Sequence, residues 1–233
     1  MDRRIALPCL VTLAVIGATR RAWASTLADL SGAEASTGLK EVLVQGASSA
    51  VDALGRPDGF LANPKVRIPL PSGVRRVERV LRATGSGPQL DELVGAMNRA
   101  AEAAVPEARG LLVDAVKAMT LADAKSLLAG GDDAATRHFR DRTAEPLAER
   151  FRPVVRRETD RVRLAQRYDR LAADAVRYRL VRAEDATLDG YVTRKALDGL
   201  YATIADAERA IRRDPAAAAG SAARRVLAAV RAG

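Results

Sequence analysis

Residues 55–71 read GRPDGFLANPKVRIPLP, and they form the only long stretch of the chain that cannot be helical. Four prolines lie within it, and each fixes its own φ and biases the residue before it towards an extended conformation. Val66, Ile68 and Leu70 alternate with basic residues and proline, which is the period of an extended segment with one buried side. We call this stretch the 55–71 loop. Its apolar content predicts that it is ordered.

A loop of this length without helix is uncommon in a compact domain and usually has a specific role. One interpretation is an ordered strap that closes one end of a helical core. The other is a loop that borders a site for a ligand or a partner protein. The loop residues that either role would use are Asp58, Phe60, Arg67 and Ile68.

Amphipathic helical patterns, with start and stop signals, fill most of the remaining chain. Ser36 or Thr37 is the expected cap of the first helix, and Asp189 that of the last strong one. Pro153 is expected to kink or break a long helical region, because its ring clashes with the preceding turn. The predicted helices cover residues 37–54, 74–84, 88–105, 106–119, 121–129, a segment after 132, 143–180, 189–214 and a marginal 222–230. These patterns predict an all-α, single-domain multi-helix bundle on which the loop packs.

Some boundaries have their own local signals. Thr120 and Asp123 have the spacing of a capping box, and Gly130 and Asp132 fit a helix stop followed by a cap. Gly85 ends one predicted helix before a cap at Ser86. These signals explain the glycine-rich segments without a phosphate or metal site.

The composition limits the chemistry. Hydrophobic residues make up 48% of the 233 residues but aromatic residues only 3%, so the core is expected to consist mainly of alanine, leucine and valine. The chain has one histidine, His138, and one cysteine, Cys9. A zinc site of histidine and cysteine ligands cannot be assembled from these two. No nucleophile elbow, P-loop or dinucleotide fingerprint occurs, and we predict no cofactor, metal or catalytic residue.

The N-terminus has the features of a secretory signal. Arg3 and Arg4 precede an apolar run at 10–18, and Ala22-Trp23-Ala24 is a cleavage motif. We predict a signal peptide at 1–24 cleaved after Ala24, a flexible segment at 25–36, a helical domain at 37–215 and an Ala/Arg-rich tail or helix at 216–233. The expected location is the periplasm or the medium, with retention of the first segment as an anchor as the alternative.

The formal net charge is +9. Basic residues alternate with acidic ones, as in Arg157-Glu158 and Asp160-Arg161, whereas proteins that bind nucleic acids cluster their basic residues. We therefore expect solvated helix faces and no nucleic-acid partner. Weak contact with anionic lipid stays open, and no membrane span is expected after cleavage.

Polar residues on two predicted helices are candidates to face the loop. Asn98, Arg99 and Glu102 share one side of a helix, and Lys195, Asp198 and Glu208 lie along another. They are expected to face Asp58 and Arg67. This cluster is either a set of structural hydrogen bonds that pin the loop or a buried polar site.

Six segments, taken in order and with their spacing, resemble one family. They are Gly55–Phe60, Asn63–Pro71, Met97–Glu102, Gly130–Asp132, Phe151–Pro153 and Tyr191–Leu200. The chain resembles the bacterial domain-of-unknown-function 4197 family over roughly residues 39–215, without the alanine-rich tail. The resemblance implies an exported, mainly helical protein of no established activity, so it supplies no site residues.

Three functions compete. The first is a non-enzymatic binding or scaffold protein with a groove beside the 55–71 loop for an apolar ligand or an envelope protein. The second is a hydrolase that uses carboxylates such as Asp58, Glu102 or Asp198. The third is a structural protein associated with envelope lipid. We favour the first, and the ligand and oligomeric state are not specified by the sequence.

Overall fold

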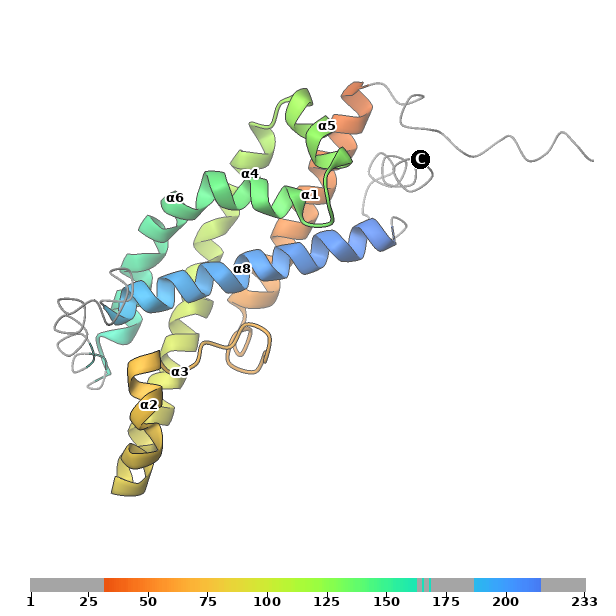
Figure 1. Cartoon of the computed structure of the whole chain (residues 1–233). Helices are drawn as coiled ribbons and strands as arrows, with labels where there is room; N and C mark the ends of the chain where they lie inside the picture. Colours follow the sequence, from red (N-terminus) through yellow and green to blue (C-terminus); the bar gives the residue numbers. More distant parts are fainter. Residues whose placement is uncertain (1–31, 163–164, 166–167, 169–186, 215–233) are drawn as a thin grey trace, which may run out of the picture.

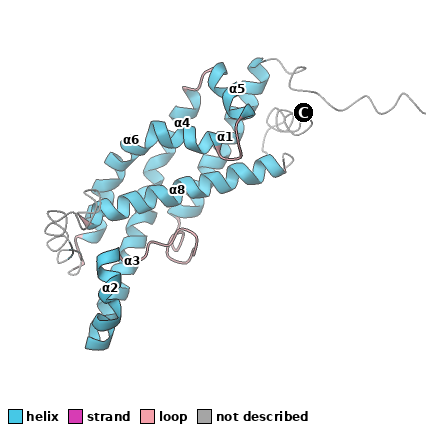
Figure 2. Ribbon diagram, in the orientation of Figure 1, coloured by secondary structure: helices cyan, strands magenta, loops and turns pink. Residues whose placement is uncertain are grey.

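The computed structural model describes residues 32–162, 165, 168 and 187–214. Within these residues every regular element is a helix, which confirms the all-α prediction (Figure 2). The α-helices are α1 (Gly32–Gly55), α2 (Ser72–Leu81), α3 (Gly87–Ala104), α4 (Ala108–Lys117), α5 (Leu121–Ala129), α6 (Ala134–Thr159) and α8 (Leu188–Arg213). The short turns η1 (Arg82–Ser86) and η2 (Val105–Glu107) join α2 to α3 and α3 to α4. The predicted signal peptide, the tail at 216–233 and residues 169–180 of the helix expected up to residue 180 lie outside the described residues.

The bundle is built around α3, α6 and α8, which pack against one another (Figure 1). α1 contacts α8, α4 and α5. α2 and the start of α3 extend from one end of the bundle, with the 55–71 loop beside them at the same end. α2 carries no fully buried residue. The 55–71 loop, α2 and the start of α3 therefore form the least compact end of the described bundle.

Two apolar clusters form the interior. The larger one joins the apolar side of the loop to α3, α6 and α8, and Phe60, Leu90, Met97 and Phe151 in it are fully buried. The smaller cluster fills the space between α1, α4, α5 and α6. The residues predicted to share one face of α8 are all buried, among them Val192, Leu200 and Ile204. The amphipathic pattern thus identifies the packed face of α8, whereas Val77 and Val80 on α2 are exposed.

Several predicted boundaries are wrong. α1 begins at Gly32, before the expected cap at Ser36 or Thr37. Thr187 caps α8 by accepting a hydrogen bond from the Gly190 N–H (3.2 Å), and Asp189 lies in the first turn. Ser86 occupies the cap position of α3 as expected, but its side chain forms no capping hydrogen bond.

α6 continues through both Pro146 and Pro153 instead of breaking. The two prolines are seven residues apart, so the missing N–H groups fall on the same side of the helix. The opposite side buries Leu147, Phe151 and Val155 completely. Packing of that side holds the helix together across the lost hydrogen bonds, because tertiary contacts contribute most of the stability of a helix.

Two local signals are confirmed. Thr120 and Asp123 form the predicted capping box, in which each side chain binds the backbone N–H of the other. Gly85 adopts φ +87°, and at this residue the chain leaves the helical path of α2 before α3 begins. Only glycine adopts this conformation without strain.

Candidate functional site

Asn98 of α3 holds the extended part of the 55–71 loop. Its side-chain Oδ1 accepts a hydrogen bond from the Ile68 N–H (2.8 Å), and its Nδ2 donates to the Ile68 carbonyl (3.0 Å). The same Nδ2 also donates to the Val94 carbonyl (2.8 Å). Asn98 is completely buried. One amide side chain thus replaces the two backbone hydrogen bonds that a neighbouring strand would provide.

Glu102, one turn further along α3, holds the start of the loop. Its Oε1 accepts hydrogen bonds from the backbone N–H groups of Phe60 (2.9 Å) and Leu61 (3.1 Å). The residue is only 6% exposed. A buried carboxylate is costly unless it is hydrogen-bonded, and two backbone donors compensate for that cost. Glu102 is therefore committed to the loop backbone.

The apolar side of the loop reaches the core. Phe60 and Ile68 are both 0% exposed, so these two predicted ligand residues are packing anchors. A methyl group on Gly199 would lie 2.8 Å from Cε1 of Phe60, which shows how closely the ring approaches α8. The Tyr191 hydroxyl donates to the Pro69 carbonyl (3.0 Å) and ties the loop to α8 a second time.

The turn that opens the loop requires its particular residues. Asp58 adopts φ +62°, a conformation that aspartate tolerates better than most residues. Gly59 follows, and a Cβ there would be 2.5 Å from the Leu54 carbonyl oxygen. Its N–H donates to the Arg56 carbonyl (3.0 Å). No side chain fits at position 59, so the Asp58-Gly59 pair fixes the path of the chain out of α1.

The polar side of the loop borders an open hollow of about 510 Å³, which we call the loop-side hollow. Leu61, Ala62, Val94 and Gly95 contribute apolar surface to it. The charged residues around it are Asp58, Arg67, Asp91 and Arg99. The hollow has a mixed, charged lining, whereas the sequence led us to expect an apolar groove beside Phe60 and Ile68.

The charges around the loop-side hollow are unevenly paired. Asp91 accepts from Arg82 (2.8 Å), and this hydrogen bond holds the pKa of Asp91 below its usual value. Asp58, Arg67 and Arg99 have no ion-pair partner in the described part of the chain. The Arg99 guanidinium lies over Gly95, where a Cβ would be 3.0 Å from it. Two arginines are thus available at this surface for a negatively charged group.

Asp198 does not join this cluster. It lies between Arg140 of α6 (2.6 Å) and Arg194 of its own helix (3.6 Å), and it lines a second hollow between α6 and α8. Lys195 is half-buried on α8 and forms no ion pair within the described residues. The expectation that both face Asp58 and Arg67 is wrong for Asp198, because the turn of α8 that carries it faces α6.

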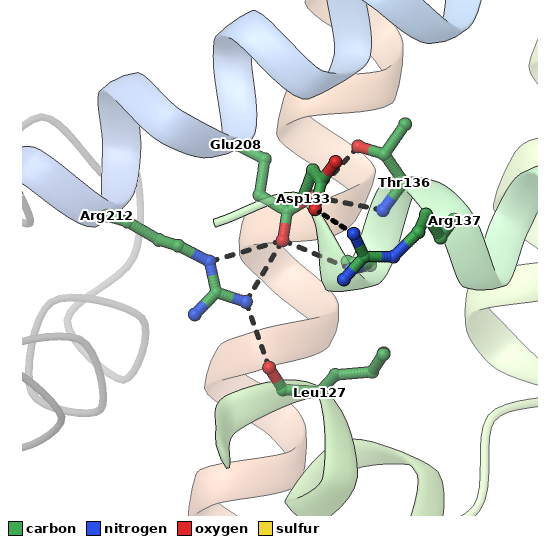
Figure 3. Close-up of polar contacts among 7 residues, drawn as sticks. Leu127, Asp133, Thr136, Arg137, Glu208 and Arg212 are labelled. Atoms are coloured by element: carbon green, nitrogen blue, oxygen red, sulfur yellow. Dashed lines mark hydrogen bonds and ion pairs between the residues drawn. The ribbon is translucent and has the colours of Figure 1, made fainter. Parts of the chain in front are cut away.

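Glu208 also lies away from the 55–71 loop, at the point where α5, α6 and α8 meet (Figure 3). Its carboxylate accepts from the backbone N–H groups of Ala135 (3.1 Å) and Thr136 (3.0 Å) and from the Thr136 hydroxyl (2.8 Å). Arg212 pairs with Glu208 (3.0 Å) and donates to the Leu127 carbonyl (2.9 Å). This buried group joins the start of α6, the end of α5 and α8. Sequence reasoning missed Thr136, which no local pattern links to Glu208. It also missed Arg212, although Arg212 lies four residues after Glu208, the spacing of a helical ion pair.

Two other features are absent from the part of the chain that the structure describes. No group of three or more histidine, cysteine, aspartate or glutamate side chains is placed to hold a metal ion. Among the same residues, none of the helices combines the length and apolar character that crossing a membrane requires.

A family model described as "Protein of unknown function (DUF4197)" matches residues 29–228. The chain belongs to the DUF4197 family. The match extends beyond residues 39–215 at both ends, so it includes residues 216–228 of the alanine-rich tail, which the resemblance in the sequence did not cover. No curated protein and no solved structure matches the chain significantly.

Proposed function

We propose that this protein is an exported, non-catalytic binding or scaffold protein that uses the 55–71 loop as a fixed recognition edge. The partner we infer is an acidic segment of another envelope protein, bound at the loop-side hollow. Arg67 and Arg99 would pair with its carboxylates. Leu61 and Val94 would contact its apolar side chains.

The observation that carries this proposal is how the loop is held. Asn98 and Glu102 are buried and bind the loop backbone directly. The charged side chains on the outer side of the loop are therefore presented on a fixed backbone. Binding to a preorganised surface loses less conformational entropy than binding to a mobile one. An irregular loop with this much buried polar support is well suited to recognition.

The positions of the candidate carboxylates favour binding over hydrolysis. Hydrolysis by a carboxylate pair requires the two groups to flank one bond. Asp58 lines the loop-side hollow, whereas Asp198 lines the hollow between α6 and α8. Glu102 is occupied by the Phe60 and Leu61 N–H groups. None of the three forms a pair with another across a shared hollow.

A site-specific cross-linking experiment tests the recognition edge. A photoreactive amino acid replaces Ala62, which is exposed and lines the hollow, or Ala83, which is exposed beyond α2. We expect a defined adduct in living cells from position 62 and none from position 83. The adduct should disappear when Arg67 and Arg99 are both changed to glutamate. Absence of an adduct at 62, or an adduct that survives both changes, would contradict the proposal.

Export is tested separately. Intact-mass analysis of the protein from the periplasmic fraction is expected to show a chain that begins at Ser25. A chain that keeps Met1, or one confined to the cytoplasm, would remove the envelope partner from the proposal.

A second candidate function, association with anionic envelope lipid, is favoured by α2. Val77 and Val80 are 48% and 63% exposed, the largest exposures of bulky apolar residues within the described chain. Arg75, Arg76 and Arg79 on the same helix have no ion-pair partner among the described residues. A basic amphipathic helix that projects from a bundle is typical of a membrane-surface contact.

Vesicle sedimentation tests this second candidate. Each arginine near an anionic surface contributes about 1 kcal/mol, so removing three should weaken binding by on the order of a hundredfold. The test variant carries Arg75→Gln, Arg76→Gln and Arg79→Gln, and the control of equal charge carries Lys125→Gln, Arg150→Gln and Arg161→Gln. We expect loss of binding to vesicles rich in phosphatidylglycerol only for the first. Equal behaviour of the two variants would rule out α2 as the lipid contact.

A further inference from the structure

The bundle covers only part of the apolar side of α2. Val74, Val77, Val80 and Leu81 recur at the three- and four-residue spacing that places side chains on one side of a helix. Val74 and Leu81 are half-buried and pack against the larger apolar cluster. Val77 and Val80, on the same side, are 48% and 63% exposed. The contact with the bundle is therefore displaced from the middle of the apolar side, and two of its four residues are left uncovered.

The attachment of α2 to the described part of the bundle is weak. None of its residues is fully buried, and among the described helices it packs closely only against the adjoining η1 turn (Figure 1). Within the described residues, one side-chain hydrogen bond joins this region to α3, from Arg82 to Asp91 (2.8 Å), and both side chains are exposed. Exposed ion pairs contribute little stability. Segments with few buried contacts open more easily than the core.

Glycines lie at both ends of α2. Gly73 is in its first turn, and Gly85 follows in η1, where the chain turns with φ +87°. A Cβ at either position would have no atom within 4 Å, so close packing requires neither glycine. Hinges consist of a few residues at the ends of elements that absorb changes in φ and ψ. Leu70 and Leu90, which lie beyond the two glycines, are buried and hold the chain on either side. α2 thus lies between two anchored points with a flexible residue near each.

The charge of α2 limits what can cover its apolar side. Arg75, Arg76 and Arg79 have no ion-pair partner among the described residues, whereas Glu78 is bound to Arg82 (2.9 Å). A second copy of the chain would bring like charges together, which is unfavourable. None of the segments outside the described residues carries a net negative charge, so they offer no complement either. A lipid surface with anionic head groups complements both the arginines and the apolar side.

We propose that α2 is a hinged arm that lifts from the bundle and lies flat on an anionic bilayer, with Val74 and Leu81 entering the lipid beside Val77 and Val80. This inference rests on the second candidate function, association with anionic lipid, and adds a change of structure to it. In the bundle only two of the four apolar residues are available to a membrane. After release all four are, and the arginines lie at the level of the head groups.

A covalent lock tests the movement in the full chain. Arg82→Cys and Asp91→Cys are combined with Cys9→Ser, and the two thiols are either linked by a short bis-maleimide or capped separately with N-ethylmaleimide. The link holds the end of α2 against α3, and the capped protein carries the same substitutions without it. In sedimentation with vesicles rich in phosphatidylglycerol, we expect the capped protein to bind at least about tenfold more tightly than the linked one, because it buries two further apolar side chains.

A fluorescent reporter shows whether α2 enters the lipid. Val80→Trp is at an exposed position, and with Trp23→Phe it is the only tryptophan in the chain. Its emission should shift to shorter wavelength when the capped protein binds vesicles, and binding without a shift would overturn the inference. Equal binding of the linked and capped proteins would also overturn it, because α2 would then bind lipid without leaving the bundle, and the lipid contact itself would stand. If neither form binds, the second candidate function fails and the inference fails with it.

Discussion

The ring of Phe60 lies directly against the backbone of Gly199, so closely that a Cβ on Gly199 would be 2.8 Å from Cε1 of the ring and 3.2 Å from Cβ of Val66. The loop and α8 fit together at this point only because residue 199 has no side chain. We expect Gly199→Ala to lower the free energy of unfolding by about 1–3 kcal/mol, the usual cost of overpacking a core.

Urea denaturation measures this change. Gly110→Ala in α4 is the matched control, since no atom lies within 4 Å of a Cβ there. It should stabilise the protein by about 0.5–1 kcal/mol, because alanine is preferred to glycine in a helix. A Gly199→Ala protein as stable as the wild type would show that the loop is not packed against α8 in solution.

A second prediction concerns Asn98. Asn98→Leu has a similar size but leaves the N–H and the carbonyl of Ile68 without partners, at about 1–3 kcal/mol for each buried group. Hydrogen exchange of the Ile68 amide should accelerate with the loss of stability. Gln89→Leu, an exposed position on the same helix, should change stability by less than about 0.5 kcal/mol. Slow exchange at Ile68 in the Asn98→Leu protein would contradict the geometry.

A third prediction concerns Glu208 and Arg212. Glu208→Ala removes the acceptor for two N–H groups at the start of α6 and leaves the guanidinium of Arg212 buried, with a side chain that is only 14% exposed. Breaking a buried pair of this kind costs about 3–5 kcal/mol. Glu208→Gln keeps one carbonyl acceptor and should cost less. Glu149→Ala, at an exposed position on α6, is the control. In thermal unfolding, Glu208→Ala should destabilise the protein most, Glu208→Gln less and Glu149→Ala least, and any other order would contradict the structure.

A fourth prediction concerns pH. Burial lowers the pKa of His138 below its usual value, and Arg142 adds to the effect. Above about pH 6.5 the imidazole is neutral in both the folded and the unfolded chain. As the pH falls below that value the unfolded chain takes up the proton more readily, so the folded state loses stability. The Nε2 atom of His138 is buried and has no hydrogen-bond partner among the described residues, so a proton on it would find no acceptor there.

His138→Gln should therefore lose less stability than the wild type between about pH 7.5 and about pH 5, where most carboxylates remain ionised. Urea midpoints at the two pH values provide the comparison. Parallel decreases in the two proteins would show that His138 does not contribute to the pH dependence.

Local patterns predicted the parts of the fold that depend on neighbouring residues. The alternation of Val66, Ile68 and Leu70 identified the buried side of the loop, and the spacing of Thr120 and Asp123 identified a real capping box. Local patterns left open whether Pro153 kinks or breaks the helix, and packing decides this. Nothing local shows that the apolar side of α6 is buried strongly enough to carry the helix through Pro153.

The residues of the candidate site also divide into those that local patterns predict and those that depend on how the helices pack. Asn98 and Glu102 share one side of a predicted helix with Arg99, and this spacing led to them. The sequence does not specify how α8 is turned, so it could not separate Asp198, which faces Arg140, from the loop.

The bond between Asn98 and Ile68 also has a consequence for how the molecule behaves in a crowded compartment. An extended, β-branched segment with free backbone groups is a template onto which a second chain can add as a strand, and such edges lead to aggregation. Here both backbone groups of Ile68 are already occupied by an amide from α3, and the apolar side chains on either side of it point inwards. The centre of the most strand-like stretch in the protein is thereby closed to intermolecular pairing.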